Sequence, residues 1–317
     1  MTEFRELSFP SSDGIHTIHA CEWVPEGQPK GVVQLVHGVA EYAARYDHVA
    51  RTLCDHGYLV CGEDHLGHGK TAKPDEYGWF ADRNGWDLIT ADVRGLRQLQ
   101  NEKYPGLPYF MVGHSMGSFL TRTYLCRYPG EVSGAVLSGT GQESAFNVRM
   151  GKLLSSLICK CKGSRYVSPL LDSLSLGGYN KKFKPNRTSA DWISRDEQVV
   201  DTYLKDPLCS FKPTAGMFHD MMGGLQYISS PKALAQMDKT TPIYIFSGDQ
   251  DPVGAMGRGV KKVHGYFDAH GVRDLTLKLY PGGRHEMFNE LNGDQVKADL
   301  VAWLDQHLEG AKRDFSL

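Results

Sequence analysis

The chain has 317 residues and is 41% hydrophobic, so one α/β domain with a large insertion fits as well as two domains. Its formal net charge of −2 offers no electrostatic case for a nucleic-acid-binding protein. The first residues are charged rather than apolar, no stretch approaches a membrane span, and the seven cysteines lack disulfide or metal-ligand spacing, so we expect a soluble cytoplasmic protein.

The first half of the chain alternates predicted strands with predicted helices. Two strands joined by the turn Ser11-Ser12-Asp13-Gly14 indicate an opening hairpin. The β-branched run at 31–38 is typical of a strand that helices cover on both faces. Strict alternation of this kind predicts a mostly parallel α/β sheet. The predicted strands are 4–9, 15–23, 31–38, 58–61, 109–113 and 132–138, and the predicted helices are 43–56, 86–103 and 116–128.

The alternation stops after residue 138. Residues 139–231 contain no convincing strand and are rich in Ser, Gly, Pro and short helical patches. A structureless loop of this length is uncommon, which favours an inserted helical subdomain. Strands resume at 242–248 and 275–280 with a helix between them, and a final helix is expected at 292–308.

We therefore predict a catalytic domain formed by residues 1–140 and 233–317, with a helical lid at 141–232 over the carboxyl edge of the sheet. The predicted lid is basic, with 13 Lys or Arg against 8 Asp or Glu, whereas the remaining chain carries a net charge of −7.

One apolar stripe of the predicted lid recurs at helical spacing. It consists of Met150, Leu153, Leu154, Leu157 and Ile158. Such a stripe usually packs on the core, and we take that as the first expectation. Because lysines flank it, the alternative is that it borders an acyl tunnel or makes a transient contact with an anionic membrane surface.

The stretch Gly113-His114-Ser115-Met116-Gly117 predicts a sharp turn from a strand into a helix. Glycines two positions before and after the serine let the strand and the helix approach closely. The turn would present the Ser115 hydroxyl at a helix N-terminus, where a nucleophile is well placed. Ser115 is therefore the candidate nucleophile.

An activated serine needs a base, and the base needs an acid that fixes its tautomer. His285 follows the last predicted strand and is the candidate base. The loop after the preceding strand offers two carboxylates, Asp249 and Asp251, of which we favour Asp251. All of these residues lie where strands end, which is the edge at which parallel sheets bind ligands.

The chain resembles the monoacylglycerol lipase and lysophospholipase-like branch of the α/β-hydrolases, grouped with the serine aminopeptidases. Five ordered blocks spanning nearly the whole chain carry this resemblance: His37 to Glu41 with Arg45-Tyr46, Asp64 to Gly69, Gly113 to Gly117, Gly248 to Val253, and Gly283 to Glu290.

The resemblance implies an α/β-hydrolase fold with a catalytic triad of Ser115, Asp251 and His285. It also implies an oxyanion hole formed by the backbone amides of Val39 and Met116. The implied substrate is a small acyl ester, namely a monoacylglycerol or a lysophospholipid. No motif of the family is recognised in the predicted lid.

Four other histidines, His37, His65, His68 and His114, fall within these blocks. We expect them to be mostly structural and to hydrogen-bond loop carbonyls, with a role for His37 or His114 in shaping the site as the alternative. Together with Asp64, two of them could approach a metal, but further ligands are lacking. We expect no metal and no cofactor.

Two other functions remain open at this point. An aminopeptidase, short-acyl esterase or thioesterase could use the same triad. From a different class, the chain could be a non-catalytic ligand-binding protein with a hydrolase fold, in which the Ser115 turn is only structural.

Overall fold

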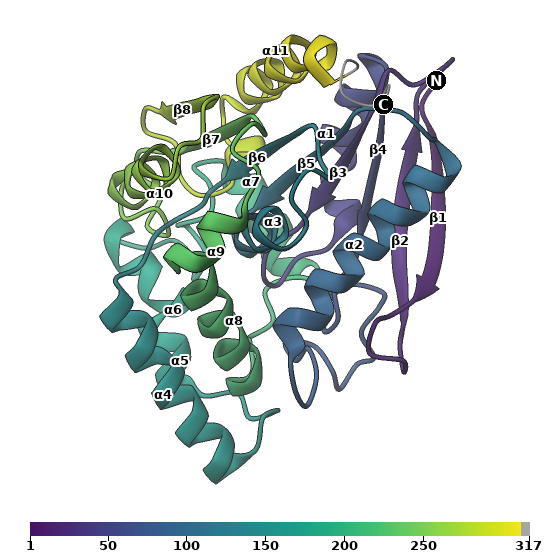
Figure 1. The fold of residues 1–317 in the computed structure, drawn as a ribbon. Helices are drawn as coiled ribbons and strands as arrows, with labels where there is room; N and C mark the ends of the chain where they lie inside the picture. The colour runs from purple at the N-terminus through teal and green to yellow at the C-terminus, as the bar shows by residue number, and fades with distance from the viewer. Residues whose placement is uncertain (312–317) are drawn as a thin grey trace.

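The apolar runs predicted as strands pair into a single sheet in the computed structural model, which describes residues 1–311 (Figure 1). The strands are β1 (Glu3–Pro10), β2 (Thr17–Val24), β3 (Gly31–Val36), β4 (Tyr58–Glu63), β5 (Tyr109–His114), β6 (Gly134–Ser138), β7 (Ile243–Gly248) and β8 (Leu275–Tyr280). They lie in the order β1-β2-β4-β3-β5-β6-β7-β8. β1 and β2 form an antiparallel hairpin, β2 pairs antiparallel with β4, and the other pairs are parallel. The predicted fold class is confirmed.

Helices cover both faces of this sheet. They are α1 (Asp47–Asp55), α2 (Gly85–Lys103), α3 (Met116–Arg127), α10 (Arg258–Ala269) and α11 (Gly293–Ala311), with short 3-10 turns η1 (Ala43–Tyr46) and η3 (Met287–Asn289). The helix predicted at 43–56 thus begins as the separate turn η1. α1 ends just before Gly57, whose φ of 81° lies in the left-handed region.

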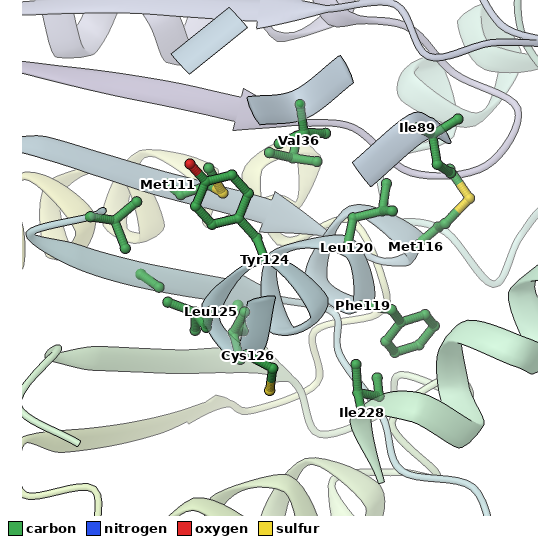
Figure 2. Packing of buried hydrophobic residues seen from close by; sticks show 14 of the residues in the cluster. Val36, Ile89, Met111, Met116, Phe119, Leu120, Tyr124, Leu125, Cys126 and Ile228 are labelled. Atoms are coloured by element: carbon green, nitrogen blue, oxygen red, sulfur yellow. The ribbon is translucent and has the colours of Figure 1, made fainter. Parts of the chain in front are cut away.

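The core consists of two layers because the side chains of each strand alternate between its faces. Val32 and Val36 of β3 pack in the cluster that includes α2, α3 and α10. Val33 and Leu35 point the other way, into the cluster with α1 and α11. Figure 2 shows the first layer around α3, with Tyr124 lying near Met111 of β5.

The segment between β6 and β7 is helical throughout its regular elements. These are α4 (Ala145–Lys162), α5 (Pro169–Leu174), α6 (Leu176–Tyr179), the 3-10 turn η2 (Asn180–Phe183), α7 (Glu197–Lys205), α8 (Ala215–Ile228) and α9 (Pro231–Gln236). α8 packs on α2 and α3, and α4 packs along α8 (Figure 1). α9 crosses the predicted boundary at residue 232, because Pro231 begins that helix. None of the helices within residues 1–311 is long and apolar enough to cross a membrane.

The apolar stripe of α4 is divided between two surroundings. Leu154 and Ile158 pack in a small cluster against α8. Met150, Leu153 and Leu157 are exposed by 48%, 54% and 51%. The expectation that the stripe packs on the core is therefore wrong for these three residues, because their i, i+3 and i+7 positions point away from α8.

The glycines around Ser115 lead to a stability prediction. Gly117→Ala should destabilise the protein by about 1–3 kcal/mol, a typical result of overpacking, because the added methyl would overlap the carbonyl oxygen of Val36 in β3. Gly265→Ala in α10 is the matched control, since nothing lies within 4 Å of its Cβ position. That substitution should be neutral or slightly stabilising, because Ala favours a helix over Gly. Guanidinium chloride unfolding measures both, and a Gly117→Ala midpoint equal to wild type would contradict the close approach.

Candidate active site

Ser115 occupies a strained turn between β5 and α3. Its φ of 52° and ψ of −118° lie outside the ordinary helical and strand regions. Its amide donates to the carbonyl of Ser138 at 2.9 Å, which joins the turn to the next strand. The turn can close only because Gly113 and Gly117 have no side chains; a Cβ at either position would overlap neighbouring backbone. The hydroxyl is thereby placed at the N-terminus of α3.

His285 and Asp251 form a buried pair. Nδ1 of His285 lies 3.0 Å from each carboxylate oxygen of Asp251. Asp251 also accepts hydrogen bonds from the Ser247 hydroxyl at 2.7 Å and from a loop amide at 2.9 Å. Asp249, the alternative acid, instead accepts from the amide of Gly282 at 2.8 Å. The structure thus brings Asp251, rather than Asp249, to His285.

The environment of His285 raises its pKa although the ring is buried. Burial lowers the pKa, but the charge and the hydrogen bond of Asp251 outweigh it, with smaller contributions from Glu286 and Glu41. With Nδ1 bonded to the carboxylate, Nε2 is the nitrogen left to accept a proton. His114 differs, because burial and the nearby His285 hold its pKa well below the usual value. His285 is therefore the ring suited to take up a proton.

Ser115 and His285 line one cavity of about 110 Å³, whereas Asp251 lies behind the histidine ring. The apolar side chains of this cavity come mainly from α3 and α8: Met116, Phe119, Phe218, Met221, Met222 and Leu225. Carboxylates and aromatic side chains make up another part of the lining: Glu41, Glu143, Glu286, Tyr179, Trp192 and Tyr203. Among the described residues that line the cavity there is no Lys or Arg.

The loop after β3 approaches Ser115 closely. A Cβ at Gly38 would lie 3.1 Å from the Cβ of Ser115, so glycine suits this position. Val39 and Met116, the residues that the resemblance assigns to the oxyanion hole, both line the cavity. Met116 also opens α3, where the first amides have no carbonyl partner one turn earlier. Both residues are therefore near the serine.

A buried ion-pair network connects this loop to the His285 loop, and sequence reasoning assigned it no role. Arg45 donates to Glu41 at 3.0 Å and to both carboxylate oxygens of Glu286 at 2.9 and 2.8 Å. Glu41 also accepts from the amide of Gly38 at 2.5 Å. The i, i+4 spacing of Glu41 and Arg45 was visible in the sequence, but the third member is 241 residues away from Arg45.

The other histidines of the recognised blocks behave largely as expected. His37, His65 and His68 each place a ring nitrogen within 3.2 Å of a loop carbonyl, which confirms the expected hydrogen bonds. His114 is the exception: Nδ1 lies 3.2 Å from the Ser138 hydroxyl, and its ring lies 4.6 Å from that of His285. Residues 1–311 contain no cluster of three or more side chains arranged to hold a metal ion.

Comparisons with known proteins place this arrangement among hydrolases. The sequence profile of the family described as serine aminopeptidase, S33, matches residues 27–292. The chain is 34% identical to monoacylglycerol lipase from Mycolicibacterium smegmatis, with 96% of this chain and 98% of the relative covered. It is 27% identical to human monoglyceride lipase, with 94% and 92% covered. The crystal structure of a thermostable carboxyl esterase from Bacillus coagulans in complex with glycerol superposes with a TM-score of 0.89 at 32% identity, with 97% and 100% covered.

The two aspartates lead to a prediction about reactivity. Asp251→Asn should slow the reaction of Ser115 with a fluorophosphonate by about 10³- to 10⁴-fold, because the imidazolium loses its charged partner. It should also lower the pKa of His285, since Asp251 is the main group that raises it.

Asp249→Asn is the matched control and should be labelled at nearly the wild-type rate. The dependence of the labelling rate on pH measures both effects. If Asp249→Asn were labelled slowly and Asp251→Asn at the wild-type rate, Asp249 would be the acid of the triad.

Proposed function

The chain belongs to the monoacylglycerol lipase-like branch of the serine aminopeptidase S33 family of α/β-hydrolases, and we propose that it cleaves the carboxylic ester of a monoacyl lipid. The observation that carries this proposal is the joint placement of strained Ser115 and Asp251-bound His285 at one largely apolar cavity. The relatives named monoacylglycerol lipase and the glycerol complex of the Bacillus coagulans esterase support it.

The proposed reaction proceeds through an acyl-enzyme. His285 takes the proton of the Ser115 hydroxyl, and the oxygen attacks the ester carbonyl. The amides of Val39 and Met116 stabilise the oxyanion, for which the N-terminus of α3 is electrostatically suited. His285 then gives its proton to the departing alcohol. Water, activated by the same histidine, releases the fatty acid.

The cavity lining favours a neutral head group over an anionic one. Arg45, the cation of the ion-pair network beside this site, already binds Glu41 and Glu286. A lysophospholipid phosphate would therefore meet carboxylates without a lysine or arginine in the lining, whereas a glycerol group carries no charge. Monoacylglycerol is accordingly the first substrate we propose, and lysophospholipid the second.

No observation favours the aminopeptidase alternative in the same way. A free amine needs an available carboxylate, but Glu41 and Glu286 at the cavity are both occupied by Arg45. Glu143 is exposed and already accepts a hydrogen bond from the Asn147 side chain at 3.1 Å. Activity on a panel of monoacylglycerols, lysophospholipids, acyl-CoAs and aminoacyl amides would separate these classes.

The division of the chain and its contact with lipid form the second part of the proposal. Residues 141–232 serve as a lid over a catalytic domain of residues 1–140 and 233–317. The outer face of α4 would rest transiently on an anionic membrane, because Leu153 and Leu157 are exposed beside Lys152. A cytoplasmic location stays a prediction from the sequence.

The nucleophile assignment is tested by Ser115→Ala. This variant should lose both the burst and the turnover on a p-nitrophenyl ester, because no acyl-enzyme can form. Circular dichroism should match wild type, and fluorophosphonate labelling should disappear. Retained turnover would contradict the mechanism. A wild-type protein that resists labelling would instead support the non-catalytic ligand-binding alternative.

Membrane contact is tested with the double variant Leu153→Asp, Leu157→Asp. It should reduce co-sedimentation with liposomes containing anionic phospholipid, because two charges would enter the apolar contact. The double variant Ile15→Asp, Leu291→Asp is the matched control: its residues are exposed by 79% and 67% but lie outside residues 141–232. Equal liposome binding by wild type and both variants would rule out the α4 contact.

A further inference from the structure

Trp192, which comes from the segment between η2 and α7, lies against the ring of His285. The two ring centroids are 5.0 Å apart with an interplanar angle of 36°. His114 lies at 4.6 Å with an angle of 48°. His285 therefore has two close ring neighbours, an indole from the insertion and an imidazole from β5.

The segment that carries Trp192 is held to the His285 loop by hydrogen bonds to its main-chain carbonyls. The amide of Glu286 donates to the carbonyl of Ile193 at 2.7 Å. Arg284 donates to the carbonyls of Asp191 and Ser194. These bonds flank Trp192 on both sides in the sequence, so its main chain is fixed relative to the His285 loop. The ring is held further by Tyr179, whose centroid is 5.1 Å away.

Within residues 1–311, Nδ1 is the only ring nitrogen of His285 that makes a hydrogen bond. Nδ1 lies 3.0 Å from both carboxylate oxygens of Asp251. With an interplanar angle of 36°, the indole lies closer to parallel with the imidazole than edge-on to it, so we expect it to leave Nε2, the nitrogen that would exchange a proton with Ser115, available. Trp192 can therefore restrict rotation of the ring without blocking the proton transfer.

We propose that Trp192 is a positioning residue that holds the His285 imidazole in place and stabilises the imidazolium through its π face. This inference rests on the proposed function, in which His285 becomes positively charged in the transition state. Indole has the strongest cation–π interaction among the aromatic side chains, and the interaction grows when water is excluded. The imidazolium would thus be stabilised by a carboxylate in its plane and by an indole on its face.

The other charged and titratable groups around His285 set the background for this effect. Asp251 from the loop after β7, Glu41 from the loop after β3 and Glu286 from its own loop favour the charged ring. His114 from β5 is held neutral by burial, with Arg45 as a further positive neighbour. None of these groups belongs to the segment that carries Trp192, so substitution of the indole leaves them in place.

Trp192→Leu and Trp192→Phe distinguish a π contact from an apolar cover. Both variants keep an apolar side chain over His285, but only Phe keeps an aromatic face. For Trp192→Leu we expect the plateau of kcat/KM on a p-nitrophenyl ester to fall by about 2- to 30-fold through kcat, the range of a lost cation–π contact. The acidic limb of its pH profile should move down by roughly 0.3 to 1.5 units, the same free energy expressed as a pKa shift, because the neutral base then persists to lower pH.

Trp192→Phe should retain most of the plateau value of kcat/KM, and the acidic limb of its pH profile should lie close to that of wild type. If both variants lose the same share of kcat/KM and their acidic limbs do not move, Trp192 has only a packing role, and the inference is overturned. If Ser115→Ala keeps full turnover, the proposed function fails instead, and that result is independent of the Trp192 variants.

A spectroscopic measurement tests the contact without catalysis. The fluorescence of Trp192 is obtained by subtracting the spectrum of the double variant Ser115→Ala, Trp192→Phe from that of Ser115→Ala. This difference emission should be quenched as the pH falls and His285 becomes protonated. The quenching should disappear when His285→Gln is added. A Trp192 emission that does not change with pH, or that still titrates in the His285→Gln protein, would overturn the inference even if Trp192→Leu does not fold.

Discussion

The close approach between β5, α3 and β3 is the constraint on which the rest of the site depends. Gly117 lies against the Val36 carbonyl, and Gly113 lies against the first turn of α3. With side chains at these positions the helix would be displaced from the sheet, and Ser115 would leave its strained conformation. The same absence of a side chain at Gly38 lets the loop after β3 reach the serine. Three glycines therefore bring the serine turn, α3, β3 and the loop after β3 together.

Around this compact arrangement, His285 and Arg45 are both largely removed from water, so the charged form of each is stabilised by neighbouring carboxylates. His285 would resist protonation in this environment were it not for Asp251. Arg45 is likewise buried, and it is stabilised by the carboxylates of Glu41 and Glu286 despite the desolvation that opposes its charge. Because Glu41 also binds the Gly38 amide, this ion-pair network links the loop beside the serine to the loop that carries the base. The two loops are thus positioned by electrostatics as well as by the sheet.

The insertion consists of parts that contact the sheet domain in different ways. Residues 191–194 bond directly to the His285 loop through main-chain carbonyls, and α8 packs on α2 and α3. α4 packs mainly along α8 and leaves Leu153 and Leu157 exposed. The part nearest the base is therefore structurally part of the site, whereas the outer face of α4 is exposed, as the proposed lipid contact requires.

The sequence by itself determined the α/β alternation, the turn at Ser115 and the strand ends at which His285 and Asp251 lie, because these depend on local patterns of apolar residues, glycines and turn residues. Tertiary structure decided which carboxylate faces His285, since Asp249 and Asp251 are two residues apart in one loop. It also decided that Glu286 meets Arg45, that Trp192 lies beside His285 and that only two of the five residues of the α4 stripe pack against α8. These contacts join segments distant in the chain, so they depend on strand order and loop geometry that no local pattern contains.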